Sequence, residues 1–176
     1  ASGAVAGLSA GLMGALTSVQ AAGFGTAQLR GLNGEQIGAL GVGAVRGLNP
    51  VVMGALASDQ VAALKPEQVG GMSAVQVGSL ASGAVRGIGP DVTTAQVRAL
   101  GSEQIGAFGT AAIRGFAAAQ VKAFGSDQVA GFGTEQVRVL SGEQVGSLTS
   151  AAVAGLSAGL MGALTSVQAA GFGTAQ

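Results

Sequence analysis

The sequence predicts an all-α fold, a solenoid-like array of very short helices in which each eight-residue repeat supplies one helix. Large apolar residues return at every eighth position of the chain, and residues that favour a helix start follow them directly. Of the 176 residues, 48% are apolar and only 9% are charged. Disordered chains have the opposite composition, so we expect these apolar side chains to be buried.

We call the eight-residue repeat the octad and number its positions from the large apolar residue, which is position one. Two of its positions are apolar throughout. Position one is apolar at every step from Leu8 to Ile88 and again from Val92 to Phe172. Position six is apolar too, and every glutamine of the chain lies at position five. We therefore predict that positions one and six form the core. The predicted structural core residues are Leu32, Ile37, Leu40, Val45, Leu64, Val69, Leu100, Ile105, Phe108, Phe124, Val129, Phe132, Val137 and Leu140.

A single continuous helix does not fit the octad. Eight residues turn through about 800° in an α-helix, so the position-one side chains would drift around the axis, and each interior glycine would cost about 1 kcal/mol. The chain holds 33 glycines. The helix must therefore end and start again in every octad.

The helix start is predicted at position two, which is rich in Ser, Thr, Asn and Gly. Pro50, Pro66 and Pro90 all follow position two directly, and proline is favoured at the first helical position after such a cap. With position two as the N-cap, the glutamine at position five can complete a capping box. Where position two is glycine, as at Gly101, Gly109, Gly125 and Gly133, it can instead end the preceding helix in a left-handed conformation, with the next residue, Ser102, Thr110, Ser126 or Thr134, as the N-cap; either way the break falls in the same place.

A β-solenoid is the alternative fold. Position six and the small position eight would then face inward from a short strand, and the glycines would form corners. Alanine and glutamine are weak strand formers, however, and Pro66-Glu67-Gln68 is typical of a helix start. Position one also follows position eight directly, which breaks strict alternation, so we favour helices and leave the strand alternative open.

Residues 1–176 read as one continuous array with a longer repeat superimposed. The octad frame skips four residues at 88–92, where Val92 is the new position-one residue. Residues 152–176 repeat residues 4–28 letter for letter at an offset of 148, which equals eighteen octads plus the skip. We interpret the chain as one 148-residue block and the start of the next, cut from a longer array. The skip would reset the phase of the repeat once in each block.

One octad cannot fold alone. Burying one large side chain and one β-branched side chain offsets only part of the conformational entropy of eight residues. Stability must come from burial against neighbouring octads, as in other repeat proteins. We therefore expect the chain to associate with itself, either with neighbouring repeats or as a homo-oligomer.

The few charged residues are also placed by position. Most acids lie at position four and most bases at position seven, and the eight bases and eight acids cancel. One hypothesis is that ion pairs between adjacent turns or neighbouring chains fix the register. The alternative is a solvated face on which each pair contributes under about 1 kcal/mol. The residues proposed for register ion pairs are Glu35, Arg46, Glu103, Arg114, Glu135 and Arg138.

The composition excludes most enzyme classes. Without His or Cys the chain has no Ser-His-Asp triad, no thiol nucleophile and no ordinary zinc or haem ligands. We predict no catalytic, cofactor-binding or metal-binding residue and no enzymatic activity. Zero net charge removes any general electrostatic reason to bind nucleic acid.

The uncharged stretch from Ala1 to Leu29 is long enough to raise the question of a membrane span. Ser9, Thr17, Ser18 and Gln20 argue against membrane insertion, because they keep the octad spacing of the charged part of the chain. A membrane-active repeat remains a third candidate function.

The octads at 32–40 (LNGEQIGAL) and 132–140 (FGTEQVRVL) have the same pattern. The whole chain is similar to octad arrays of the type L-[ST]-x-x-Q-[VI]-x-A, found in very large bacterial surface or secreted proteins of adhesin type, although it has more Gly and Phe than these arrays. The resemblance implies an extracellular or cell-surface location in a bacterium. We expect a structural protein that builds a fibre, tube or sheath, or alternatively the stalk of an adhesin whose binding domain lies outside these residues.

Overall fold

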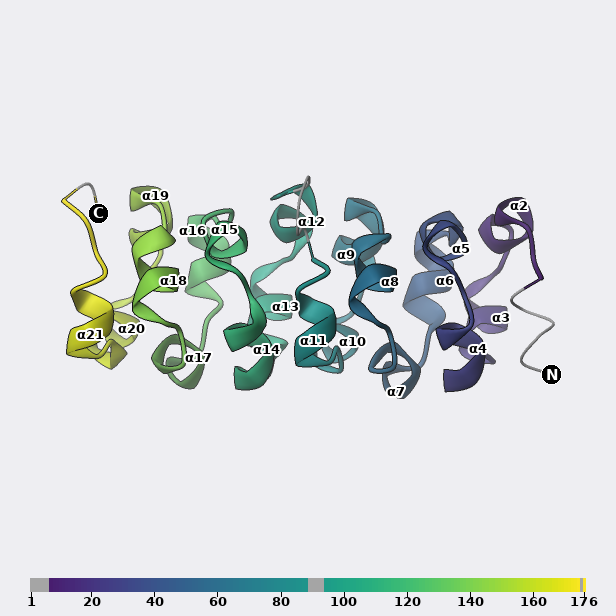
Figure 1. Cartoon of the computed structure of the whole chain (residues 1–176), viewed down its shortest axis with the longest axis horizontal. Helices are drawn as coiled ribbons and strands as arrows, with labels where there is room; N and C mark the ends of the chain where they lie inside the picture. Colours follow the sequence, from purple (N-terminus) through teal and green to yellow (C-terminus); the bar gives the residue numbers. More distant parts are fainter. Residues whose placement is uncertain (1–6, 89–93, 175) are drawn as a thin grey trace.

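The computed structural model describes residues 7–88, 94–174 and 176, which form an elongated rod of short α-helices (Figure 1). Helix accounts for 63% of the described residues, which contain no strand. The predicted all-α array of very short helices is confirmed. The β-solenoid alternative is wrong for the described residues.

Each helix of the described residues belongs to one octad and is four to six residues long. The helices are α2 (Ala10–Gly14), α3 (Ser18–Ala22), α4 (Thr26–Arg30), α5 (Gly34–Ala39), α6 (Val42–Gly47), α7 (Pro50–Met53), α8 (Ser58–Ala62), α9 (Pro66–Gly71), α10 (Ala74–Gly78), α11 (Ser82–Val85), α12 (Thr94–Ala99), α13 (Ser102–Ala107), α14 (Thr110–Gly115), α15 (Ala118–Val121), α16 (Ser126–Ala130), α17 (Thr134–Arg138), α18 (Gly142–Ser147), α19 (Ser150–Val153), α20 (Ala158–Ala163) and α21 (Ser166–Ala169).

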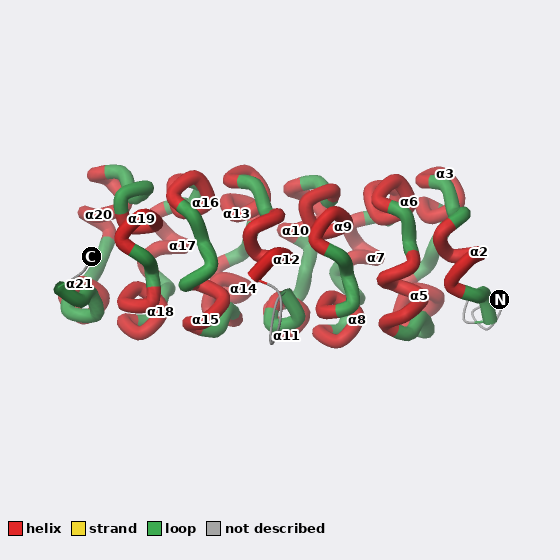
Figure 2. The backbone as a smooth tube through the Cα atoms, turned by 90° about the horizontal axis from the view of Figure 1, so that it is seen from above, coloured by secondary structure: helices red, strands yellow, loops and turns green. Residues whose placement is uncertain are grey.

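The helices stack in three columns along the rod, because each helix packs on the helix three octads away (Figures 1 and 2). One column contains α2, α5, α8, α11, α14, α17 and α20 in succession. In the second, α3, α6, α9 and α12 pack in succession, as do α15, α18 and α21; the third contains α4, α7, α10, α13, α16 and α19. One turn of the solenoid therefore consists of three octads.

The side chains at positions one and six fill a single core along the axis. Every predicted core residue is buried, with at most 6% of its surface exposed. Phe108, Phe116, Phe124 and Phe132 come from successive octads and meet edge to face, with ring centroids 5.3, 5.5 and 5.6 Å apart. This edge-to-face geometry is the one aromatic rings favour. Position one therefore lies close to the axis, where all three columns meet.

Position two is the N-cap of the helices, as predicted. The Asn33 side chain accepts a hydrogen bond from the backbone N–H of Gln36, whose own side chain accepts from the Asn33 N–H. The prediction of left-handed glycines is wrong. Gly101, Gly109 and Gly125, for example, have φ of −82°, −64° and −90° and act as N-caps in extended conformation, because the preceding helix has already ended.

The four-residue skip, with Val92 as its predicted position-one residue, lies largely outside the described residues. On either side of it the columns continue, since α9 packs on α12, α10 on α13 and α11 on α14. Ile88 is fully buried. Its carbonyl accepts from the side chain of Gln120, so Ile88 fills position one of this turn. The skip therefore leaves the three-column register unchanged.

Stacking brings the backbones of adjacent turns into close contact at position eight. A Cβ atom built on Gly47, the last residue of α6, would overlap the carbonyl oxygen of Ser18 in α3. A Cβ atom on Gly43, in the same helix, would have no neighbour within 4 Å. The two glycines therefore separate the effect of close packing from the effect of helix propensity.

We expect Gly47→Ala to destabilise the rod by about 1–3 kcal/mol, because α3 and α6 must move apart to admit the methyl group. Gly43→Ala is the matched control, and it should stabilise α6 by up to about 1 kcal/mol. Urea unfolding followed by circular dichroism at a helix-sensitive wavelength measures both changes. Equal shifts of the unfolding midpoint in the two variants would contradict close backbone packing at Gly47.

Candidate functional site

All the buried polar side chains in the described part of the chain are glutamines at position five. Their exposed fractions lie between 1% and 7%. A buried amide must form hydrogen bonds with both its oxygen and its nitrogen, because leaving either unsatisfied costs about 1–3 kcal/mol. The buried glutamines are Gln36, Gln60, Gln68, Gln76, Gln96, Gln104, Gln120, Gln128, Gln136, Gln144 and Gln168.

The glutamine side chains join consecutive turns, as Gln76 illustrates. Its Oε1 accepts from the backbone N–H of Ser73, the N-cap of its own helix, at 2.9 Å. Its Nε2 donates to the carbonyl oxygens of Val45 and Leu48 in the preceding turn, both at 2.8 Å. One side chain therefore satisfies an N–H at the start of one helix and the carbonyl of Leu48, just past the end of α6, and adds a second bond to the Val45 carbonyl, which also accepts from the Leu48 N–H.

We call this set of contacts the glutamine seam, formed by the position-five glutamine of one turn and the carbonyls of positions six and one in the turn before. The acceptors lie 31 and 28 residues before the glutamine, for example at Leu29 and Leu32 for Gln60. Across the skip the intervals become 35 and 32, as for Gln104. In the described residues no buried side-chain nitrogen or oxygen lacks a partner.

The capping box formed by Oε1 was predicted from the sequence, but the bonds from Nε2 to the preceding turn were not. The signal was present, because a capping box accepts Glu as readily as Gln, and position five never contains Glu. The exclusion of Glu indicates that a donor is needed at this position.

The proposed register ion pairs are not formed between turns of the described chain. Glu135 and Arg138 pair at 2.9 Å, but both belong to α17 and both are exposed. Arg46 instead donates from Nε to the carbonyl oxygen of Gly71 in the next turn at 2.8 Å. An exposed pair within one helix contributes little to register. Among the described residues Glu35, Glu103 and Arg114 form no salt bridge.

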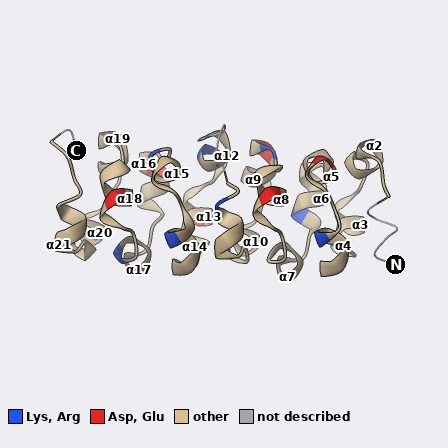
Figure 3. Cartoon of the chain, viewed as in Figure 1, with Lys and Arg blue, Asp and Glu red and all other residues tan. Residues whose placement is uncertain are grey.

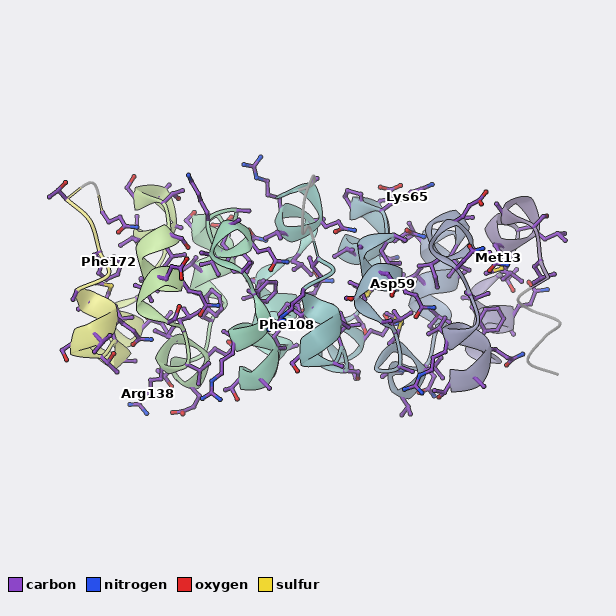
Figure 4. The ribbon with its side chains drawn as sticks, viewed as in Figure 1. Met13, Asp59, Lys65, Phe108, Arg138 and Phe172 are labelled. Atoms are coloured by element: carbon purple, nitrogen blue, oxygen red, sulfur yellow. The ribbon has the colours of Figure 1, made fainter. Side chains whose placement is uncertain are left out.

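The charged residues are spread along the rod and do not gather in one patch (Figure 3). Arg138 and Lys65 project from opposite long edges in Figure 4. The shallow surface depressions contain charges of both signs, as between Arg98, Lys122 and Asp127. In residues 7–88, 94–174 and 176 no three acidic, His or Cys side chains come together in a way that could hold a metal ion. No helix of these residues is long and apolar enough to cross a membrane.

The chain matches no protein-family model, no curated protein and no solved structure.

Gln168 and Gln20 allow a test of the seam within one sequence context, because residues 165–176 repeat residues 17–28. The Nε2 of Gln168 donates to the carbonyl oxygens of Val137 and Leu140 at 2.7 Å, whereas Gln20 is exposed and its Nε2 has no acceptor in the described chain. A carboxylate at position 168 would keep the acceptor for the N-cap but would face the two carbonyls without a donor.

We expect Gln168→Glu to destabilise α20 and α21 by about 1–3 kcal/mol at neutral pH, and Gln20→Glu to change stability by under about 0.5 kcal/mol. Desolvation and the facing carbonyls would raise the pKa of the introduced carboxyl in the folded chain. The destabilisation should therefore shrink as the pH falls from the raised folded-state pKa toward the ordinary Glu pKa of about 4.3, and it should be lost below that value, where folded and unfolded chains are both protonated. Amide hydrogen exchange of the two segments measures the difference, and equal loss of protection in both variants would contradict a cross-turn role.

Proposed function

We propose that this chain is a structural protein, a self-stacking repeat array that forms an extracellular fibre, tube or sheath and has no enzymatic activity. The observation that carries the proposal is that each turn bonds to the turn before it and to the turn after it through the same seam. A fold of this kind has no internal stop, and its length is set only by the number of repeats.

The distribution of side-chain chemistry supports this proposal. Buried polar side chains among the described residues are confined to the seam, and the shallow depressions of the lateral surface contain charges of both signs. The interactions therefore serve cohesion between turns. The extracellular or cell-surface location in a bacterium rests on the resemblance of the octads to those of large surface proteins.

The second candidate is the stalk of an adhesin. It is favoured by the course of the chain, because the first and last described helices, α2 and α21, lie at opposite ends of the rod (Figure 1). A rod of this form can hold a binding domain away from a surface. The two candidates differ in whether the rods associate with one another.

Electron microscopy of the purified chain separates the candidates. We expect regular filaments if the array is structural, and monomeric rods if it is a stalk. Phe132→Asp and Val137→Asp should each abolish filaments, because the two side chains are 6% and 1% exposed and an unpaired charge in the core costs several kcal/mol. Val75→Asp, at a side chain 67% exposed, is the control and should leave the fold intact. Unchanged assembly of the Phe132 and Val137 variants would contradict a core at positions one and six.

A further inference from the structure

In the column that contains α5, α8, α11 and α14, the exposed charges are sorted by sign along the rod. Position four holds an acid in the first two of these helices, at Glu35 and Asp59. Position seven holds a base in the next two octads, at Arg86 and Arg114, and all four side chains are exposed. Figure 3 shows the acids in red on α5 and α8 and a base in blue on α14, along the diagonal course that this column takes in Figure 1. We call these four residues the charged strip.

Positions four and seven of one octad project from the same side of their column. Glu135 and Arg138 hold these two positions in α17, and their side chains pair at 2.9 Å. Residues three apart lie on one face of a helix, so the same relation holds in the other octads. The acids and bases of the charged strip therefore belong to one surface of the column.

The charged strip is unpaired within the described chain. None of its four side chains forms a hydrogen bond or a salt bridge there. Arg30 lines the same depression as Asp59, but its Nε donates to the carbonyl oxygen of Ala55 at 3.4 Å. Glu143 lines a depression with Arg114 and forms no salt bridge with it. The sequence predicts register ion pairs either between turns or between neighbouring chains, and for this strip only the second kind is left.

The uncharged positions of the strip hold small residues. In each of its four octads, whichever of positions four and seven carries no charge is glycine or alanine, at Gly38, Ala62, Gly83 and Ala111. No bulky side chain therefore stands beside the charges to keep a second rod away. The column winds around the rod, from α2 at the upper right to α17 at the lower left of Figure 1, so one straight contact is limited to a few turns.

The order of signs along the strip is complementary to itself under a two-fold axis. An axis perpendicular to the rod, placed between α8 and α11, reverses the direction of the rod and of every helix that faces its copy. It lays the start of α8 over the end of α11 of the second copy, and the start of α5 over the end of α14. Asp59 then faces Arg86 of the second copy, and Glu35 faces Arg114. Each pair occurs twice, because a two-fold contact repeats every interaction.

We infer that two copies of this chain bind side by side and antiparallel through the charged strip, with four ion pairs around the two-fold axis. This inference rests on the proposed structural function and adds a lateral contact to it. One exposed ion pair contributes little, but complementary charges select among arrangements, because like charges brought together are unfavourable. A parallel pair in register would bring the acids of both copies together, and likewise the bases. The strip therefore specifies both the direction and the register of the second rod.

Charge reversal at the centre of the strip tests this contact. Arg86→Glu and Asp59→Arg each place two pairs of like charges across the axis, so each variant should dimerise at least about tenfold more weakly than the unmodified chain at low ionic strength. The double variant, Asp59→Arg with Arg86→Glu, restores opposite charges across the axis and should dimerise like the unmodified chain. In a parallel contact staggered by two turns, Glu35 would face position 86 and Asp59 would face position 114. The double variant would then bind more weakly than either single variant.

Sedimentation velocity at a series of protein concentrations and at low and high ionic strength measures the dimer, which salt should weaken. Arg98→Glu is the matched control, because Arg98 is an exposed base at position seven of α12, in a different column. It should dimerise like the unmodified chain. All the replaced side chains are exposed, so every variant should fold, and circular dichroism verifies this. A double variant that stays monomeric, or a control that loses as much affinity as Arg86→Glu, would overturn the inference.

The outcomes also separate this inference from the proposed function. Filaments that Arg86→Glu leaves unchanged in amount and width by electron microscopy would preserve the structural role and overturn the lateral contact. Dimers that respond to charge reversal as described but never lengthen into filaments would support the contact and contradict the fibre. An unmodified chain that stays monomeric at every concentration would overturn both.

Discussion

The rod depends on satisfying the backbone groups at the ends of its helices. A helix of four to six residues has few internal hydrogen bonds, because the first four N–H groups and the last four carbonyls have no partner within it. Isolated helices shorter than about 12 residues are marginal in water. The position-five glutamine resolves both problems, because it caps its own helix and binds the carbonyls at the end of another helix one turn earlier. No octad is complete without a turn beside it.

This requirement explains why small residues are placed where they are. Nε2 reaches the preceding turn only if the two backbones approach closely. Gly131 and Gly171, in the octads of Gln128 and Gln168, permit that approach at position eight, where a Cβ atom would overlap a carbonyl oxygen of the preceding turn. The apolar residues at positions one and six supply the burial that holds the turns at this distance. Glycine at position eight therefore serves packing between turns, which outweighs its poor helix propensity.

The sequence predicts the repeating unit well and the relation between units poorly. Positions one, two, five and six each have a local reason, namely core, cap, capping box and core, so period and residue type together predict the short helix. The number of octads in a turn has no such local signal, because the angle between consecutive helices decides it and the octad pattern is the same for any angle. The acceptors of Gln60, 28 and 31 residues earlier, follow only from three octads per turn. The left-handed glycines were predicted because the preceding helix was expected to end at position two. In the structure that helix ends earlier, so the glycine is an extended N-cap.

Three octads per turn also explain the 148-residue period. Eighteen octads make six whole turns, and the four additional residues are absorbed within one connection without displacing any column. As a result α2 and α20, which share the letters AGLMG, belong to the same column. A period of seventeen or nineteen octads would have placed identical segments in different columns. In a longer array of such blocks, each lateral feature would return in the same column once per block, so that equivalent side chains of successive blocks would lie in the same column of the rod.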